Sequence, residues 1–159
     1  MSEAAPQTAG VTQTDPATEF ADLDVDTPLV GIIMGSKSDM PEMEKAGAIL
    51  TEQGIHFEVR VMSAHRDPGT VADYCRNARM RGLRVIIAGA GLSAALPGVA
   101  AAHSDLPVIG VPLSSRLSAM GGLDAILSIV QMPPGVPVAG VGLNNARNAG
   151  HLAARILSL

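Results

Sequence analysis

Aromatic residues and cysteine are scarce in this sequence. Its 159 residues include no tryptophan, one tyrosine, two phenylalanines and a single cysteine, Cys75. The core must therefore be built from aliphatic side chains and methionine, with close packing of the backbone. One cysteine excludes a disulfide-rich secreted module. A chain of this length buries enough surface to be stable as one domain without a metal or a disulfide.

Charge is sparse as well. Charged residues make up 16% of the chain, the net charge is -4 at pH 7, and no block of basic residues occurs. An acidic chain without a basic face is not expected to bind nucleic acid. No apolar run approaches the roughly 20 residues that a membrane-spanning helix needs, so we expect no membrane partner.

Residues 1–28 differ in composition from the rest of the chain. Lysine and arginine are absent before Lys37, whereas Ala, Thr, Gln, Pro and Asp are frequent. A secretory signal or a mitochondrial transit peptide would carry basic residues here. We expect residues 1–28 to be a disordered acidic extension, residues 29–159 to form the folded domain, and the protein to be cytoplasmic.

Short apolar runs alternate with helical segments along the rest of the chain. Strands are predicted at Leu29–Met34, Phe57–Met62, Val85–Ala88, Pro107–Val111 and Val138–Leu143. Helices are predicted at Asp39–Gln53, Asp67–Arg81, Leu96–His103, Leu123–Gln131 and from Asn144 or Asn145 to Leu157, with Asp39 and Glu42 forming a capping box on the first. This alternation predicts an α/β fold with a parallel five-stranded sheet between two helical layers.

Ligands bind beyond the carboxyl ends of such strands, so the loops there are candidate sites. The first loop, Gly35–Asp39, offers small and hydroxyl residues at a helix start, which suits an anion. It lacks the Walker pattern of nucleoside-triphosphate loops. A capped turn without a ligand explains the same residues.

The second loop holds the most reactive pair in the sequence. It reads Ser63-Ala64-His65-Arg66. As a histidine, His65 can accept and donate protons, and Arg66 can clamp a phosphate or carboxylate. The alternative is a surface histidine beside a helix cap, but its position next to the predicted cleft favours function. The remaining histidines, His56, His103 and His151, lie at less favourable positions.

The third loop, Gly89–Ala94, loosely matches two sequence motifs. One is the dinucleotide-binding fingerprint, and the other is the nucleophile motif of serine hydrolases. The dinucleotide fingerprint lacks its acidic partner at the end of the next strand, so glycines that admit a ligand are the better interpretation. Ser93, Asp124 and His151 follow the chain order of a serine hydrolase, but Ala95 replaces the second glycine of that motif. The scattered histidines predict no metal site.

Together these loops resemble the PurE family (class I), the N5-carboxyaminoimidazole ribonucleotide mutases of purine biosynthesis. The resemblance extends from about Val30 to Leu157. It is carried, in the family's order, by Met34–Asp39, Ser63–Arg66, Ala88–Gly91, Leu96–Gly98, Leu106–Pro112, Gly122–Asp124, Leu127–Pro133, Gly135–Val138 and Asn145–Ala149.

The resemblance implies a three-layer, flavodoxin-like catalytic domain that assembles as a homo-octamer with its sites at subunit interfaces. It implies a small-molecule ribonucleotide substrate and neither a metal nor an organic cofactor. In the family's reaction, the carboxylate leaves N5 of the substrate as carbon dioxide and is then attached to ring carbon C4. His65 would be catalytic and shuttle the proton. Substrate would be bound by Gly35, Ser36, Ser38, Asp39, Ser63, Ala64, Arg66, Ala90, Gly91 and Leu96.

The third loop departs from the family pattern. Leu92 stands where the mutases have a second glycine, and Ala95 stands where they have a histidine. Three alternatives stay open: a mutase that tolerates Ala95, a carboxylase that uses aminoimidazole ribonucleotide and carbon dioxide directly, and a non-catalytic ribonucleotide-binding paralogue.

Overall fold

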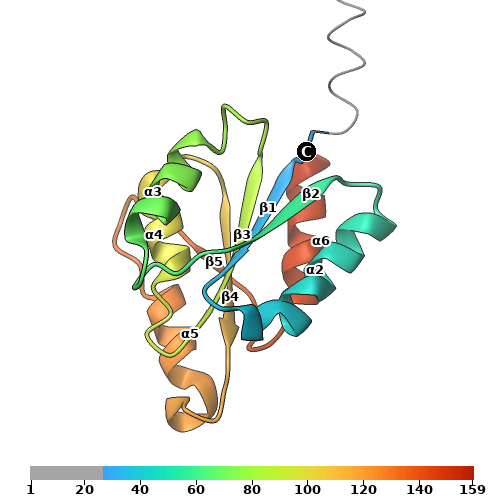
Figure 1. The fold of residues 1–159 in the computed structure, drawn as a ribbon. Coiled ribbons are helices and arrows are strands. Elements are labelled where there is room, and N and C mark those ends of the chain that lie inside the picture. The colour runs from blue at the N-terminus through green and yellow to red at the C-terminus, as the bar shows by residue number, and fades with distance from the viewer. Residues whose placement is uncertain (1–26) are drawn as a thin grey trace, which may run out of the picture.

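The computed structural model describes residues 27–159, so the predicted extension lies outside the described residues except for Thr27 and Pro28. Strands and helices alternate along the described chain (Figure 1). They are β1 (Val30–Met34), η1 (Lys37–Asp39), α2 (Met40–Glu52), β2 (Phe57–Val61), α3 (Pro68–Asn77), β3 (Val85–Gly91), α4 (Leu96–His103), β4 (Val108–Leu113), η2 (Ala119–Gly122), α5 (Leu123–Val130), β5 (Ala139–Gly140) and α6 (Ala146–Leu157).

The strands form one parallel sheet in the order β2-β1-β3-β4-β5. Helices α2 and α6 cover one face of the sheet, and α3, α4 and α5 cover the other (Figure 1). The predicted three-layer fold with a parallel five-stranded sheet is therefore confirmed. The chain passes from β1 to β2 on one side and then crosses to β3 on the other side of β1. This is the flavodoxin-like arrangement, with a ligand crevice at the carboxyl ends of β1 and β3. Within residues 27–159, none of the helices has both the length and the apolar character to cross a membrane.

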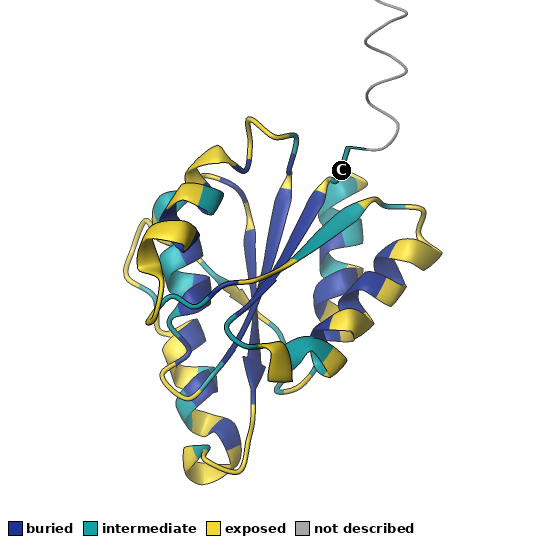
Figure 2. Ribbon diagram, viewed as in Figure 1, coloured by how far each residue is buried: buried dark blue, intermediate teal, exposed yellow. Residues whose placement is uncertain are grey.

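The core consists of two layers of aliphatic residues, one on each side of the sheet. Ile32 of β1 and Met43 of α2 belong to one layer, whereas Ile33 of β1, Val71 of α3 and Ile129 of α5 belong to the other. Strands β1 and β4 are buried throughout, and β3 is buried up to its last residue (Figure 2). The continuous apolar runs that predicted these strands are explained by helices on both faces.

The edge strands were predicted less accurately. Strand β2 alternates apolar and charged residues and is only half-buried, and β5 has two paired residues, Ala139–Gly140, instead of the six predicted at Val138–Leu143. Helix α3 ends at Asn77 rather than at Arg81. The chain leaves the helix through turns that end at Gly82, which adopts φ of 94°.

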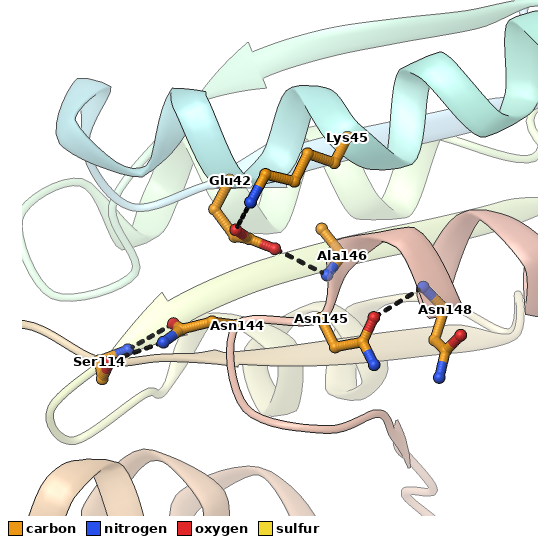
Figure 3. Close-up of polar contacts among 7 residues, drawn as sticks. All are labelled: Glu42, Lys45, Ser114, Asn144, Asn145, Ala146 and Asn148. Atoms are coloured by element: carbon orange, nitrogen blue, oxygen red, sulfur yellow. Dashed lines mark hydrogen bonds and ion pairs between the residues drawn. The ribbon is translucent and has the colours of Figure 1, made fainter.

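The capping of α2 differs from the prediction. Asp39 makes no side-chain cap there; its Oδ2 accepts from the Ser36 N–H at 3.0 Å and closes a capping box around η1. Glu42 instead reaches across to α6, where its Oε1 accepts from the Ala146 N–H at 3.1 Å (Figure 3). Of the two predicted candidates, Asn145 caps α6 by accepting from the Asn148 N–H at 3.2 Å.

Helices α2 and α6 approach each other closely at Gly150. A Cβ added at this glycine would lie 2.8 Å from the Ala46 carbonyl oxygen and 2.9 Å from Cβ of Ile49. The obstructing atoms belong to the α2 backbone and to the root of a side chain, so they cannot rotate away. The contact between the two helices therefore requires glycine.

We predict that Gly150→Ala lowers the free energy of unfolding by about 1–3 kcal/mol, because the two helices must separate. The matched control is Gly69→Ala in α3, where the nearest atom to an added Cβ is 4.0 Å away. That variant should gain up to about 1 kcal/mol, since alanine is the better helix former. Urea denaturation measures both, and equal stabilities would contradict the proposed packing.

A cluster of polar and charged side chains connects the edge strand β2 to α3. Glu58 accepts from the Tyr74 hydroxyl at 2.8 Å and forms ion pairs with Arg81 and Arg60. Partial burial raises the pKa of the Glu58 carboxyl, but the hydrogen bonds from Arg81 and Tyr74 and the charges of Arg81 and Arg60 lower it by more. The net pKa lies below the ordinary value, so the folded state favours the ionised carboxylate.

A depressed pKa in the folded state contributes stability above the carboxyl's ordinary pKa, and this stability is lost as the pH falls through the folded pKa. We therefore predict that Glu58→Gln costs on the order of 1 kcal/mol near pH 7 and much less near pH 3. Denaturation at the two pH values measures the difference. Glu44→Gln, at an exposed position on α2, is the control. A cost that does not change with pH would contradict the assigned role of the carboxylate.

Candidate active site

A cleft of about 430 Å³ lies at the carboxyl ends of the strands. Four loops line it, following β1, β2, β3 and β4. Its walls contain all eleven residues predicted from the sequence, so the fold brings residues from separate loops into one place. They are Gly35, Ser36, Ser38, Asp39, Ser63, Ala64, His65, Arg66, Ala90, Gly91 and Leu96.

The loop after β1 is organised around Ser36. Its Oγ accepts from the Ser38 N–H at 3.3 Å and from the Ser38 hydroxyl at 2.9 Å, which leaves its own hydroxyl proton available to a ligand. Partial burial raises the pKa of the neighbouring Asp39 carboxyl, and the Ser36 N–H and the charge of Arg66 offset part of this rise. The loop therefore offers hydroxyl groups and an acid whose charge is partly disfavoured.

Arg66 ties the second loop to the first. Its Nη2 donates to the Gly35 carbonyl at 3.0 Å, and its backbone N–H and Nε both donate to Ser63 Oγ at 3.2 Å. Arg66 thus fills both acceptor positions of the Ser63 hydroxyl, so the hydroxyl proton is left to form a hydrogen bond with another group. Arg66 retains further N–H groups for a ligand, and its guanidinium supplies positive charge to the cleft.

His65 is exposed between these groups. Within the part of the chain that the structure describes, no hydrogen bond engages its imidazole. An imidazole that lines the cleft without a partner suits a group that takes up a proton at one moment and releases it at another.

The third loop carries the departures from the family pattern. Leu92 adopts φ of 56°, a left-handed conformation that is strained for a leucine, and its side chain is 42% exposed in the cleft wall. A Cβ at Gly91 would lie 2.9 Å from the Leu113 carbonyl oxygen, so a side chain is excluded there. Ala95 also lines the cleft, at the start of α4, with no polar group in its side chain.

The site predicted from the sequence missed the wall supplied by β4. Leu113, Ser114 and Ser115 line the cleft in the structure. The rule that ligands lie beyond the carboxyl ends of strands pointed past Val111, so position alone was the available signal.

The serine-hydrolase alternative fails on geometry. Ser93 lies in the cleft wall, but Asp124 belongs to α5 and His151 belongs to α6, on opposite faces of the sheet (Figure 1). The Asp124 carboxylate is occupied by the Ala119 and Ala125 N–H groups. A triad needs these side chains in mutual contact. Among residues 27–159, no group of three or more His, Cys, Asp or Glu side chains is placed to hold a metal ion.

Comparison with known proteins shows the family of this chain. A sequence model of the AIR carboxylase family matches residues 29–159. This chain belongs to the AIR carboxylase family. Two curated relatives, from Thermotoga maritima and Mycobacterium leprae, are named N5-carboxyaminoimidazole ribonucleotide mutase. They are 57% identical over 132 residues (83% of this chain, 76% of the relative) and 58% identical over 130 residues (82% and 75%).

A third relative and the solved structures widen the comparison. Phosphoribosylaminoimidazole carboxylase of Schizosaccharomyces pombe is 55% identical over 134 residues, which is 84% of this chain and 24% of that protein. The crystal structure of Treponema denticola PurE is 36% identical, with a TM-score of 0.71 over 82% of this chain and 80% of that one. A PurE2 variant from the same organism is 34% identical, with a TM-score of 0.72 over the same shares.

Proposed function

We propose that this protein is an N5-carboxyaminoimidazole ribonucleotide mutase, an isomerase that forms 4-carboxy-5-aminoimidazole ribonucleotide in purine biosynthesis. The observation that carries the proposal is the cleft itself, where a free imidazole stands beside an arginine and hydroxyl donors on adjacent loops. Curated relatives of the same domain bear the name of this enzyme.

Substrate binding follows from the polarity of the cleft. The substrate is a ribonucleotide with a phosphate and a carboxylate, and both are acceptors of hydrogen bonds. Arg66 and the hydroxyl protons of Ser36 and Ser63 supply matching donors. Asp39 accepts hydrogen bonds instead, which suits a ribose hydroxyl. The other predicted residues, Gly35, Ser38, Ala64, Ala90, Gly91 and Leu96, are proposed to shape the wall around the substrate.

His65 is the proposed catalytic residue. The N5–carboxylate bond breaks and releases carbon dioxide, and the imidazolium of His65 gives its proton to N5. Carbon C4 then attacks the trapped carbon dioxide, and the neutral imidazole removes the proton from C4. One carboxylate and one proton have exchanged places, so the reaction needs no oxidant, reductant or cofactor. The cleft must exclude water and retain carbon dioxide between the two steps.

We predict that His65→Asn lowers kcat by about 10²–10⁴-fold or more, because asparagine cannot carry the proton. Formation of 4-carboxy-5-aminoimidazole ribonucleotide measures the rate, and light scattering checks that the assembly is unchanged. His56→Asn is the matched control, since His56 lies outside the cleft, before β2. A His65→Asn variant with nearly wild-type turnover would contradict the catalytic role.

The third loop supports a second candidate function. Leu92 and Ala95 change the wall of the cleft, and the Schizosaccharomyces pombe relative is named a carboxylase. The second candidate is therefore an aminoimidazole ribonucleotide carboxylase that takes up carbon dioxide directly. If Ala95 removes a group that turnover requires, the chain is instead a non-catalytic ribonucleotide-binding paralogue.

We also propose that the protein is a homo-octamer with its sites at subunit interfaces. Helix α5 exposes Leu123, Leu127 and Val130 at 37%, 47% and 49%, and the preceding segment exposes Leu117 and Met120 at 79% and 83%. The three α5 side chains follow helical spacing on one face and make an apolar stripe. A second copy of the chain would cover this stripe and help to enclose the cleft.

We predict that Leu127→Glu reduces the assembly to smaller species, because a charge would be buried at the interface. Leu127→Met is the matched control and should retain the wild-type mass. Light scattering measures both, and circular dichroism checks the fold. A wild-type monomer, or an octamer of Leu127→Glu, would contradict the proposed interface.

Three further parts of the proposal concern the whole chain. Residues 29–159 are the catalytic domain, and residues 1–28 are a separate acidic extension. Catalysis uses neither a metal nor an organic cofactor, and the protein binds neither nucleic acid nor membranes. The location is the cytoplasm, where a chain with Cys75 as its one cysteine needs no oxidising environment.

A further inference from the structure

Asn144 contacts the cleft wall from outside. Its side chain makes two hydrogen bonds to one residue: Oδ1 accepts from the Ser114 N–H at 2.9 Å, and Nδ2 donates to Ser114 Oγ at 2.7 Å (Figure 3). Ser114 lines the cleft at the end of β4, whereas Asn144 itself is not part of the lining. The two residues are 30 positions apart in the chain, and the whole of α5 lies between them.

The turn that carries Asn144 is itself fixed to the sheet. The Asn144 N–H donates to the Pro112 carbonyl in β4 at 2.9 Å, and the Asn145 N–H closes the turn on Gly142 at 3.1 Å. Asn144 adopts φ of 51°, which asparagine tolerates better than most residues. The carboxamide is therefore held against the last residues of β4 by the backbone as well as by its own bonds.

The orientation of the carboxamide follows from the chemistry of Ser114. A backbone N–H can only donate, so the atom of Asn144 that faces it must be the oxygen. The amide nitrogen then faces Ser114 Oγ and fills an acceptor position of the hydroxyl. No acceptor takes up the Ser114 hydroxyl proton in the hydrogen bonds made within residues 27–159.

We propose that Asn144 is a positioning residue that makes the Ser114 hydroxyl a hydrogen-bond donor into the cleft. The substrate atom that it addresses is an acceptor oxygen, of a phosphate or of a carboxylate. Arg66 orients the hydroxyl of Ser63, across the cleft, in the same way, by donating hydrogen bonds to its Oγ. Both serines then present donors to one anionic ligand. This inference rests on the proposed function, because it takes the ribonucleotide to be the occupant of the cleft.

The test is a double-mutant cycle with Asn144→Asp and Ser114→Ala. Asn144→Asp keeps the shape and the acceptor for the Ser114 N–H but replaces the donor by a second acceptor. The Ser114 hydroxyl then donates to the carboxylate and turns an acceptor toward the substrate. We expect KM for N5-carboxyaminoimidazole ribonucleotide to rise about 10-fold or more in each single variant, with a smaller change in kcat.

The cycle separates positioning from a general effect of charge or fold. If Asn144 acts through the hydroxyl, Asn144→Asp in the Ser114→Ala background should change KM less than about 2-fold. Asn144→Gly, which adopts the left-handed turn without strain, should give an intermediate KM because the hydroxyl rotates freely. Equal effects of Asn144→Asp in both backgrounds would overturn the proposal, and so would an unchanged KM in either single variant.

The four proteins of the cycle are the wild type, Asn144→Asp, Ser114→Ala and the double variant. Each is also titrated with 4-carboxy-5-aminoimidazole ribonucleotide in a calorimeter. If the wild type binds this ligand but has no turnover, the proposed mutase activity fails while the cycle in Kd still decides the role of Asn144. If the wild type has turnover and the cycle shows no coupling, the function stands and the positioning role fails. A wild type that neither binds nor reacts would overturn both.

Discussion

Parallel pairing of β1 with β2 and β3, and of β3 with β4, brings four loops to one edge of the sheet. The pairing is held by β1, β3 and β4, which lie between two layers of aliphatic side chains. Helices cover both faces of these strands, so a shift in register would disrupt the close packing of both core layers. The cleft is a consequence of that register, since each wall begins where a buried strand ends.

Hydrogen bonds between distant segments then fix two of the walls of the cleft. Arg66 joins the second loop to the first through the Gly35 carbonyl. Asn144 joins the turn before α6 to the last wall through Ser114. Each of these side chains also decides which atom of a serine faces the ligand. The cleft consequently presents donors, a cation and one free imidazole, a combination suited to an anionic substrate that must exchange a proton.

The sequence predicted what is local or continuous. The central strands could be recognised because helices on both faces require an unbroken apolar run. Three of the loops that line the cleft were located because parallel strands end at one edge, whereas the full set of proposed site residues came from the resemblance to the PurE family. Contacts between distant segments could not be found in this way. Glu42 looked like part of a capping box, yet its carboxylate serves α6, and Ser114 gained its role from a residue in another loop. Strand β5 was predicted over six residues but pairs through two only, because an apolar run does not indicate how many of its residues find a partner strand.

The central claim is that this cleft moves a carboxylate within one ribonucleotide even though Leu92 and Ala95 alter its third wall. The most direct test is product formation from two substrates in parallel: N5-carboxyaminoimidazole ribonucleotide, and aminoimidazole ribonucleotide with bicarbonate. Rapid conversion of the first substrate at low concentration is the result that the account predicts. Activity with the second substrate alone, or silence with both from an assembled protein, would contradict it.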